Sequence, residues 1–259
     1  SLNSIHVNPK LRIQLVASEP LVQDPVAIDF GPDGKLWVVE MNDYPSGPKG
    51  NYQPGGRVIF LEDLDGDQIY DRRTLFIDKI PFPTGVMAWG DGALICAAPE
   101  VLYAEDTDKD GYADIRQVLL TGFNTTNYQT RVNGLSYGLD NWIHGSSGLL
   151  ESLVTSTRSK QTLSLGAKSF RFIPRTGQLE ATSGRTQHGR VRDNWGNWFG
   201  NNNSSLIYHY PLADHYLQRN RFIAFPDPAV HLTQTPDWNL VYPISRTLQR
   251  FNHPQSANR

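Results

Sequence analysis

The chain has 259 residues, of which 39% are hydrophobic and 19% are charged, and its formal net charge is −2 at pH 7. This apolar content excludes a disordered chain and is enough for one large core or two smaller ones. The lack of a basic excess disfavours nucleic-acid binding, and no apolar run approaches the roughly 20 residues that cross a bilayer. Because Cys96 is the single cysteine, an internal disulfide, a CxxC zinc motif and a CxxCH haem motif are excluded.

Short alternating apolar runs, separated by Gly, Asp, Asn or Pro, dominate the sequence and predict an all-β fold. The first unit is a strand over 26–30, a turn over 31–35 and a strand over 36–39, because Asp33-Gly34 supplies the positive φ of a hairpin turn. The same unit is predicted at 84–96, 133–145 and 189–200. A further strand of each of the first three units is predicted at 58–63, 101–106 and 170–174. One short helix is predicted over 211–219.

These units recur at intervals of roughly 50 residues, which is typical of the four-stranded blades of a β-propeller. A β-sandwich is the alternative architecture, since it would contain a similar number of strands. The pattern fades after Tyr210, and no linker marks a second domain. We therefore expect a single β-propeller domain over residues 1–259.

Two acidic loops carry the sharpest local signal. Each has aspartates at positions 1, 3, 5 and 9, the spacing with which an EF-hand-type loop surrounds Ca²⁺ with oxygen atoms. The predicted metal ligands are Asp63, Asp65, Asp67 and Asp71 in one loop and Asp106, Asp108, Asp110 and Asp114 in the other. Thr74 and Gln117 stand where an EF-hand has its bidentate Glu, so we expect weak, structural sites. Alternatively, the carboxylates cap backbone amides of hairpin loops without a metal.

A set of stretches spread over nearly the whole chain resembles one known family. They are residues 17–22, 33–41, the loop that begins at Asp63, and residues 130–135, 140–145 and 201–204. These are similar to the membrane-bound dehydrogenase domain of PVC-type haem-binding proteins. The resemblance implies a secreted or periplasmic bacterial propeller, distantly similar to the quinoprotein glucose/sorbosone dehydrogenases. Those enzymes are six-bladed, so at roughly 50 residues per blade we expect four to five blades here and a domain incomplete at its C-terminus.

The resemblance also implies site residues. In the quinoprotein sugar dehydrogenases a His is the general base on the sugar hydroxyl, Arg and Asn hold the quinone, and Ca²⁺ polarises it. The stretch 131–135 is similar to their Arg-Asn-x-x-Gly-Leu, with a different spacing between Asn and Gly. The implied catalytic residues are His144, as base, with Arg131 and Asn133. The implied cofactor-binding residues are Arg131, Asn133, Gln187, His188 and Arg190. Alternatively, His144 is satisfied inside a blade and the others brace loops.

Three functions stay open. The first is a Ca²⁺-bound dehydrogenase that uses pyrroloquinoline quinone (PQQ) to oxidise a sugar or alcohol and passes electrons to a cytochrome c module or protein. The family's CxxCH module is not in this chain, so haem is not expected here. The second is a non-catalytic, Ca²⁺-stabilised module that binds carbohydrate or protein. The third is a lactonase-like propeller with Ca²⁺ on its axis. The sequence contains no GxSxG, HExxH or P-loop motif, which argues against a serine hydrolase, a zincin and an NTPase.

Overall fold

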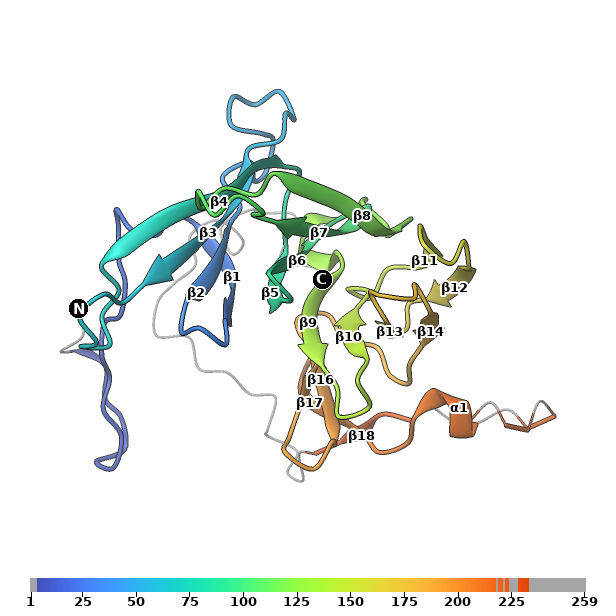
Figure 1. Cartoon of the computed structure of the whole chain (residues 1–259). Coiled ribbons are helices and arrows are strands. Elements are labelled where there is room, and N and C mark those ends of the chain that lie inside the picture. Colours follow the sequence, from blue (N-terminus) through green and yellow to red (C-terminus); the bar gives the residue numbers. More distant parts are fainter. Residues whose placement is uncertain (1–3, 218, 221, 224–227, 233–259) are drawn as a thin grey trace, which may run out of the picture.

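The structure, a computed structural model, describes residues 4–217, 219–220, 222–223 and 228–232. Within this part of the chain the strands form successive antiparallel sheets that follow one another around an arc (Figure 1). The first strands of the first three sheets, β1, β5 and β9, contact one another in turn along the inside of the arc. This is the blade arrangement of a β-propeller, and the protein is all-β as predicted.

Each blade contains four antiparallel strands that pair in chain order, with one hairpin inserted between the second and third strands of the third blade. The first blade contains β1 (Pro25–Phe30), β2 (Leu36–Glu40), β3 (Gly56–Glu62) and β4 (Arg72–Ile80). The second contains β5 (Gly85–Trp89), β6 (Gly92–Ala97), β7 (Glu100–Glu105) and β8 (Ile115–Thr121). The third contains β9 (Asn133–Tyr137), β10 (Ile143–Ser146), β13 (Phe170–Phe172) and β14 (Leu179–Ala181). The fourth contains β15 (Val191–Arg192), β16 (Trp198–Asn202), β17 (Ser205–Tyr210) and β18 (Val230–His231).

Helical structure is sparse among the described residues. A 3-10 turn, η2 (Tyr128–Thr130), precedes β9, and a short helix, α1 (Asp214–Leu217), follows β17. Asn127 caps the 3-10 turn, because its side chain accepts a hydrogen bond from the amide of Gln129. Nowhere in the described ranges is a helix long and apolar enough to cross a membrane.

Antiparallel meanders place alternate connections at opposite ends of every blade. At one end, the turn end, short turns join the first strand to the second and the third to the fourth; the acidic loops lie here, between β3 and β4 and between β7 and β8. The other end, the loop end, holds the connections between blades, including residues 122–132 before β9 and 182–190 before β15. The two ends therefore carry different sets of predicted site residues.

The core lies between adjacent blades, where apolar faces of the sheets pack together. The faces of the first and second blades bury Phe76, Ile95 and Leu102 in one cluster. The second and third blades share another cluster, which includes Leu120 and Phe170. The second blade is covered on both faces, and all six residues of its strand β6 are buried.

The third blade contains an inserted hairpin between β10 and β13. Its strands, β11 (Ser152–Ser156) and β12 (Thr162–Gly166), do not join their own blade. Instead β11 pairs with β8, with Thr155 opposite Thr121 and Ser156 opposite Leu120, so the sheet of the second blade has six strands. This hairpin covers the outer edge of the second blade.

The predicted strand-turn-strand units are confirmed in all four blades, as is the third-strand position of 101–106 and 170–174. The short helix predicted over 211–219 is confirmed only as the four residues of α1. The β11–β12 hairpin is missing from the predictions. The predicted number of blades stays a prediction, since residues 233–259 lie outside the described part.

Candidate functional site

The two acidic loops fold in the same way. Asp63 accepts hydrogen bonds from the amides of Gly66 and Gln68 at 2.7 and 2.9 Å. Asp106 accepts from Lys109 and Gly111 at 2.7 and 2.8 Å. The ninth-position aspartates likewise accept from the second-position amides, Leu64 in one loop and Thr107 in the other. In each loop the carboxylates thus accept hydrogen bonds from backbone amides of the same loop. This is the arrangement that the metal-free alternative requires.

The same loops also gather carboxylate oxygens. One ligand atom from each of Asp63, Asp65 and Asp71 lies within 4.8 Å of the others, and the same holds for Asp106, Asp108 and Asp110. Six of the eight predicted ligands therefore converge, while Asp67 and Asp114 are outside the clusters. Three carboxylates with carbonyl and water oxygens would meet the demand of a hard cation such as Ca²⁺. Calcium binding itself stays a prediction.

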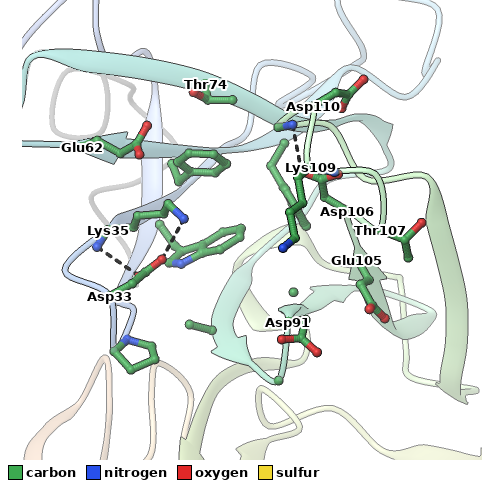
Figure 2. Close-up of a pocket in the computed structure, with 18 of the residues that line it drawn as sticks. Asp33, Lys35, Glu62, Thr74, Asp91, Glu105, Asp106, Thr107, Lys109 and Asp110 are labelled. Carbon is green, nitrogen blue, oxygen red and sulfur yellow. Dashed lines mark hydrogen bonds and ion pairs between the residues drawn. The ribbon is translucent and has the colours of Figure 1, made fainter.

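A cavity of about 990 Å³ opens at the turn end between the first and second blades (Figure 2). We call it the turn-end cavity. Its floor is aromatic, with the Trp37 ring 4.7 Å from Phe76 and 5.4 Å from Phe60. Charged side chains surround it: Lys35 pairs with Asp33 at 2.7 Å, and Lys109, Asp91 and Glu105 also line it. No single motif predicts this cavity, because its lining comes from five separate turns and strand ends.

A second cavity, of about 400 Å³, lies at the loop end, where β1 meets the segments that lead into β9 and β15. We call it the axial cavity. Tyr128, Arg131, Asn133 and His188 line it. Gly134 and Gly189 form part of the wall, and a Cβ at Gly134, whose φ is 60°, would stand 2.5 Å from the Cα of Gly189. Only glycine allows this close approach of two backbones.

Arg131 is 6% exposed and lies against aromatic rings. Its guanidinium carbon is 4.2 Å from the Tyr128 ring centre and 5.2 Å from that of Phe82, and Nη2 donates to the carbonyl of Thr125 at 2.8 Å. Nε has no hydrogen-bond partner in the described part of the chain. Burial lowers the pKa of Arg131 below its usual value. The side chain therefore brings a positive charge to the wall of the axial cavity.

The amide side chains of the predicted site are engaged within the protein. Asn133 Nδ2 donates to the carbonyls of Arg131 and Gln187 at 2.8 and 2.7 Å, and its Oδ1 accepts from the Gly189 amide at 2.7 Å. Gln187 is buried, and its Oε1 accepts from the Asn203 amide at 3.1 Å. Asn133 thus joins the third blade to the loop before β15, and Gln187 joins that loop to its own blade. Their assigned cofactor contacts stay predictions.

His144 lies apart from the axial cavity. The side chain is 3% exposed, its ring stacks on Trp198 at 4.1 Å, and Nε2 is 3.1 Å from Asp140 Oδ2. Burial, only partly opposed by Asp140, lowers the pKa of His144 to about 4. It lines a third cavity, between the third and fourth blades, which Arg190 shares and Arg131 does not. The structure therefore does not bring the predicted base together with Arg131 and Asn133, nor Arg190 with His188, because these residues line two different cavities.

The chain is similar in fold to several solved structures. It is 17% identical to the holo form of the pyranose dehydrogenase PQQ domain from Coprinopsis cinerea, over 79% of this chain and 50% of that one, with a TM-score of 0.46. It is 15% identical to a PQQ-bound aldose sugar dehydrogenase from Streptomyces coelicolor, over 76% and 61% of the two chains, with a TM-score of 0.46. A streptogramin B lyase is 12% identical over 75% and 67%, with a TM-score of 0.41.

The chain spans about half to two thirds of the length of these structures. At this level the similarity concerns the fold alone, and the function is argued below from the chain's own residues. No curated protein matches the sequence. The relationship to PVC-type haem-binding proteins stays a prediction. The match that covers residues 1–259 is to the family model DUF7133, a domain of unknown function, and the chain belongs to that family.

Proposed function

We propose that the chain is the propeller portion of a sugar or alcohol dehydrogenase of the quinoprotein type, with its reactive site in the axial cavity. The observation that carries the proposal is the convergence of Arg131, His188 and the Gly134–Gly189 contact around one cavity at the propeller axis. Ligand-binding sites are typically concave and contain a few polar groups that converge on the ligand. The resemblance of the sequence stretches supports the same reaction class.

The axial cavity fits one edge of a planar, anionic quinone such as PQQ. Arg131 offers the cationic group for a carboxylate, with Nε still without a partner among the described residues. The paired glycines leave a wall without side chains against which a flat ring can lie. When bound, the quinone would supply the two-electron acceptor.

His188 takes the role of base in this proposal, in place of His144. His188 is exposed and lines the axial cavity, and histidine is the residue most often used for proton transfer from a hydroxyl. His144 is poorly suited, because it lines the cavity between the third and fourth blades and not the axial cavity. In the oxidation, the His188 imidazole would accept the hydroxyl proton of the substrate.

The proposal also includes Ca²⁺ binding, an electron acceptor and a cellular location. Ca²⁺ in the acidic loops is supported by the two carboxylate clusters. Electron transfer to a cytochrome c, and a secreted or periplasmic place in a bacterium, are supported by the family resemblance of the sequence stretches.

The test is reconstitution of the chain with Ca²⁺ and PQQ. We expect saturable quenching of tryptophan fluorescence by the quinone, and reduction of an artificial electron acceptor with one or more sugars or alcohols. His188→Gln should keep quinone binding and lose turnover, and Arg131→Lys should weaken quinone binding. Arg185→Ala, which removes an exposed arginine from the same loop, is the matched control. Absence of both quenching and turnover would overturn the proposal.

A non-catalytic carbohydrate-binding module is the second candidate, and the turn-end cavity favours it. This cavity is larger than the axial one, and Lys109, Asp91 and Glu105, which line it together with aromatic residues, offer donors and acceptors for hydroxyl groups (Figure 2). Asp91→Ala and Lys109→Ala should then abolish binding to a glycan array while leaving quinone binding unchanged. Glycan binding without any turnover would favour this function over the first.

A further inference from the structure

The cavity between the third and fourth blades contains a buried cation without a counter-ion. Arg190 is 3% exposed, and its guanidinium carbon is 5.0 Å from the Trp198 ring centre and 5.2 Å from that of Tyr210. Its Nη1 donates to the carbonyl of Ser183 at 2.7 Å, whereas Nε has no partner in the described part of the chain. No described carboxylate pairs with it. An unpaired buried charge is costly, so such groups usually meet an anion.

The acidic side chains that line the same cavity are engaged elsewhere. Asp140 pairs with Arg171 at 2.8 Å and faces His144 at 3.1 Å. Arg171 also pairs with Glu180, and Lys168 pairs with Asp214 at 3.0 Å. Lys168 and Arg171 are thus ion-paired with the three carboxylates of the lining, and Arg190 is the one Lys or Arg of this lining without an ion-pair contact among the described residues. Burial lowers the pKa of Arg190 only to about 10, so its guanidinium is charged at neutral pH.

The cavity has room for a ligand. Its volume is about 680 Å³, within the range of small-molecule sites. Besides Arg190 it is lined by the Trp198 and Tyr210 rings and by His144, whose Nδ1 lacks a partner among the described residues. His144 is neutral at pH 7, because its pKa is lowered to about 4. With Nε2 directed to the Asp140 carboxylate, Nδ1 is left as a hydrogen-bond acceptor.

We propose that this cavity binds a small hydroxylated monocarboxylate, such as a sugar acid, with the ligand carboxylate on the Arg190 guanidinium. A guanidinium fork matches a carboxylate in two parallel hydrogen bonds. Because Lys168 and Arg171 are already paired with carboxylates, Arg190 is the one cation left for a ligand, which favours one negative charge over the two of a phosphate. The same carboxylates, and Nδ1 of His144, accept hydrogen bonds from hydroxyl groups. The site is independent of the axial cavity and of the proposed dehydrogenase function.

The test is calorimetric titration of the chain with gluconate, glucuronate, glucose and inorganic phosphate. We expect saturable binding of at least one sugar acid, with glucose and phosphate weaker by about tenfold or more, which corresponds to about 1.4 kcal/mol. Arg190→Gln should weaken sugar-acid binding by about tenfold or more. Arg185→Ala, an exposed arginine outside the cavity lining, should leave it unchanged.

Since Arg190 is buried, its replacement can also disturb folding, so circular dichroism of each variant accompanies the titration. Leu139→Trp is the second variant: Leu139 is 62% exposed, lines the cavity and tolerates a larger side chain that narrows the opening. It should lower sugar-acid affinity in a normally folded protein. No saturable binding of either sugar acid, equal binding of glucose or phosphate, or unchanged affinity in both Arg190→Gln and Leu139→Trp would overturn the proposal.

Discussion

The acidic loops of the first and second blades have the same hydrogen-bond pattern but different glycine positions. In both loops the fourth and sixth residues have positive φ: 81° at Gly66 and 73° at Gln68 in the first, 63° at Lys109 and 97° at Gly111 in the second. The backbone therefore requires two left-handed residues, and each loop supplies glycine at only one of them. The carboxylate-to-amide bonds hold the other residue in this conformation.

The loops differ more in what they touch. The second loop joins the first blade, because the Ala113 amide donates to the Phe76 carbonyl at 2.7 Å and the Tyr112 hydroxyl donates to Asp78 at 2.9 Å. In the first loop, the Tyr70 amide donates to the Val16 carbonyl at 2.9 Å, and its hydroxyl approaches the Gly34 carbonyl at only 3.4 Å. Similar sequences thus serve different structural roles, one closing the seam between two blades and the other resting on its own blade and the N-terminal segment.

Calcium titration gives the largest expected difference between the loops. Asp110 belongs to the carboxylate cluster of its loop, whereas Asp67, at the same position, is outside its own. Asp110→Ala should therefore lower Ca²⁺ affinity of its loop by about tenfold or more, and Asp67→Ala by less than about threefold, because ligand charge sets affinity. Isothermal titration calorimetry measures both. Equal losses of Ca²⁺ affinity in the two variants would contradict the assignment of Asp110, and not Asp67, as a ligand. If the wild-type protein gives no heat of Ca²⁺ binding, the metal-free interpretation of the loops is favoured.

Glycine replacement should separate the loops by stability. A Cβ at Gly111 would stand 2.8 Å from Thr74 Cγ2 across the seam, whereas at Gly66 nothing lies within 4 Å. Gly66→Ala should cost about 1 kcal/mol of unfolding free energy for the positive φ alone, and Gly111→Ala about 2 kcal/mol or more. Urea unfolding of the two variants checks the difference. A Gly66→Ala variant as destabilised as Gly111→Ala would contradict the role assigned to the seam.

The tyrosine hydroxyls provide a smaller contrast. Tyr112→Phe removes the bond to Asp78 and should lower the unfolding free energy by about 1 kcal/mol. Tyr70→Phe should change it by less than about 0.5 kcal/mol, because its 3.4 Å contact is weak. The hydrogen bond to Asp78, followed by burial, also raises the pKa of Tyr112, so ultraviolet titration reports the contact independently. Asp78→Asn should bring that pKa down towards its usual value.

The smallest expected effect is a gain. Gln68→Gly places glycine at the sixth position, as in the second loop, and removes a non-glycine residue from positive φ. We expect a stabilisation of about 0.5 kcal/mol, since the strain relieved is partly offset by the flexibility that glycine adds to the unfolded chain. Thermal unfolding measures it. Lys109→Gly is the matched variant in the other loop, and a loss of stability in both would contradict a shared left-handed requirement.

The sequence contains most of the blade pattern but little of the site. Turns such as Asp33-Gly34 are local, so the strands beside them were predicted with nearly correct bounds. Whether His144 faces the axis or a neighbouring blade depends on the pairing of β10 with β9 and on Trp198 of the next blade, which no local pattern encodes. The stretch 150–166 lacked the repeat signal, because its hairpin pairs with a strand of another blade.

That hairpin links two blades by main-chain hydrogen bonds. β8 would otherwise end the second blade with an open edge, and the strand that covers it is not synthesised until the third blade has begun. We therefore expect the second and third blades to fold as one cooperative unit. Neither blade could be replaced alone by the corresponding blade of a related protein. A chain divided between β8 and β9 would leave β8 as an unpaired edge strand on one fragment and the β11–β12 hairpin without its partner strand on the other. The two fragments should therefore associate in solution.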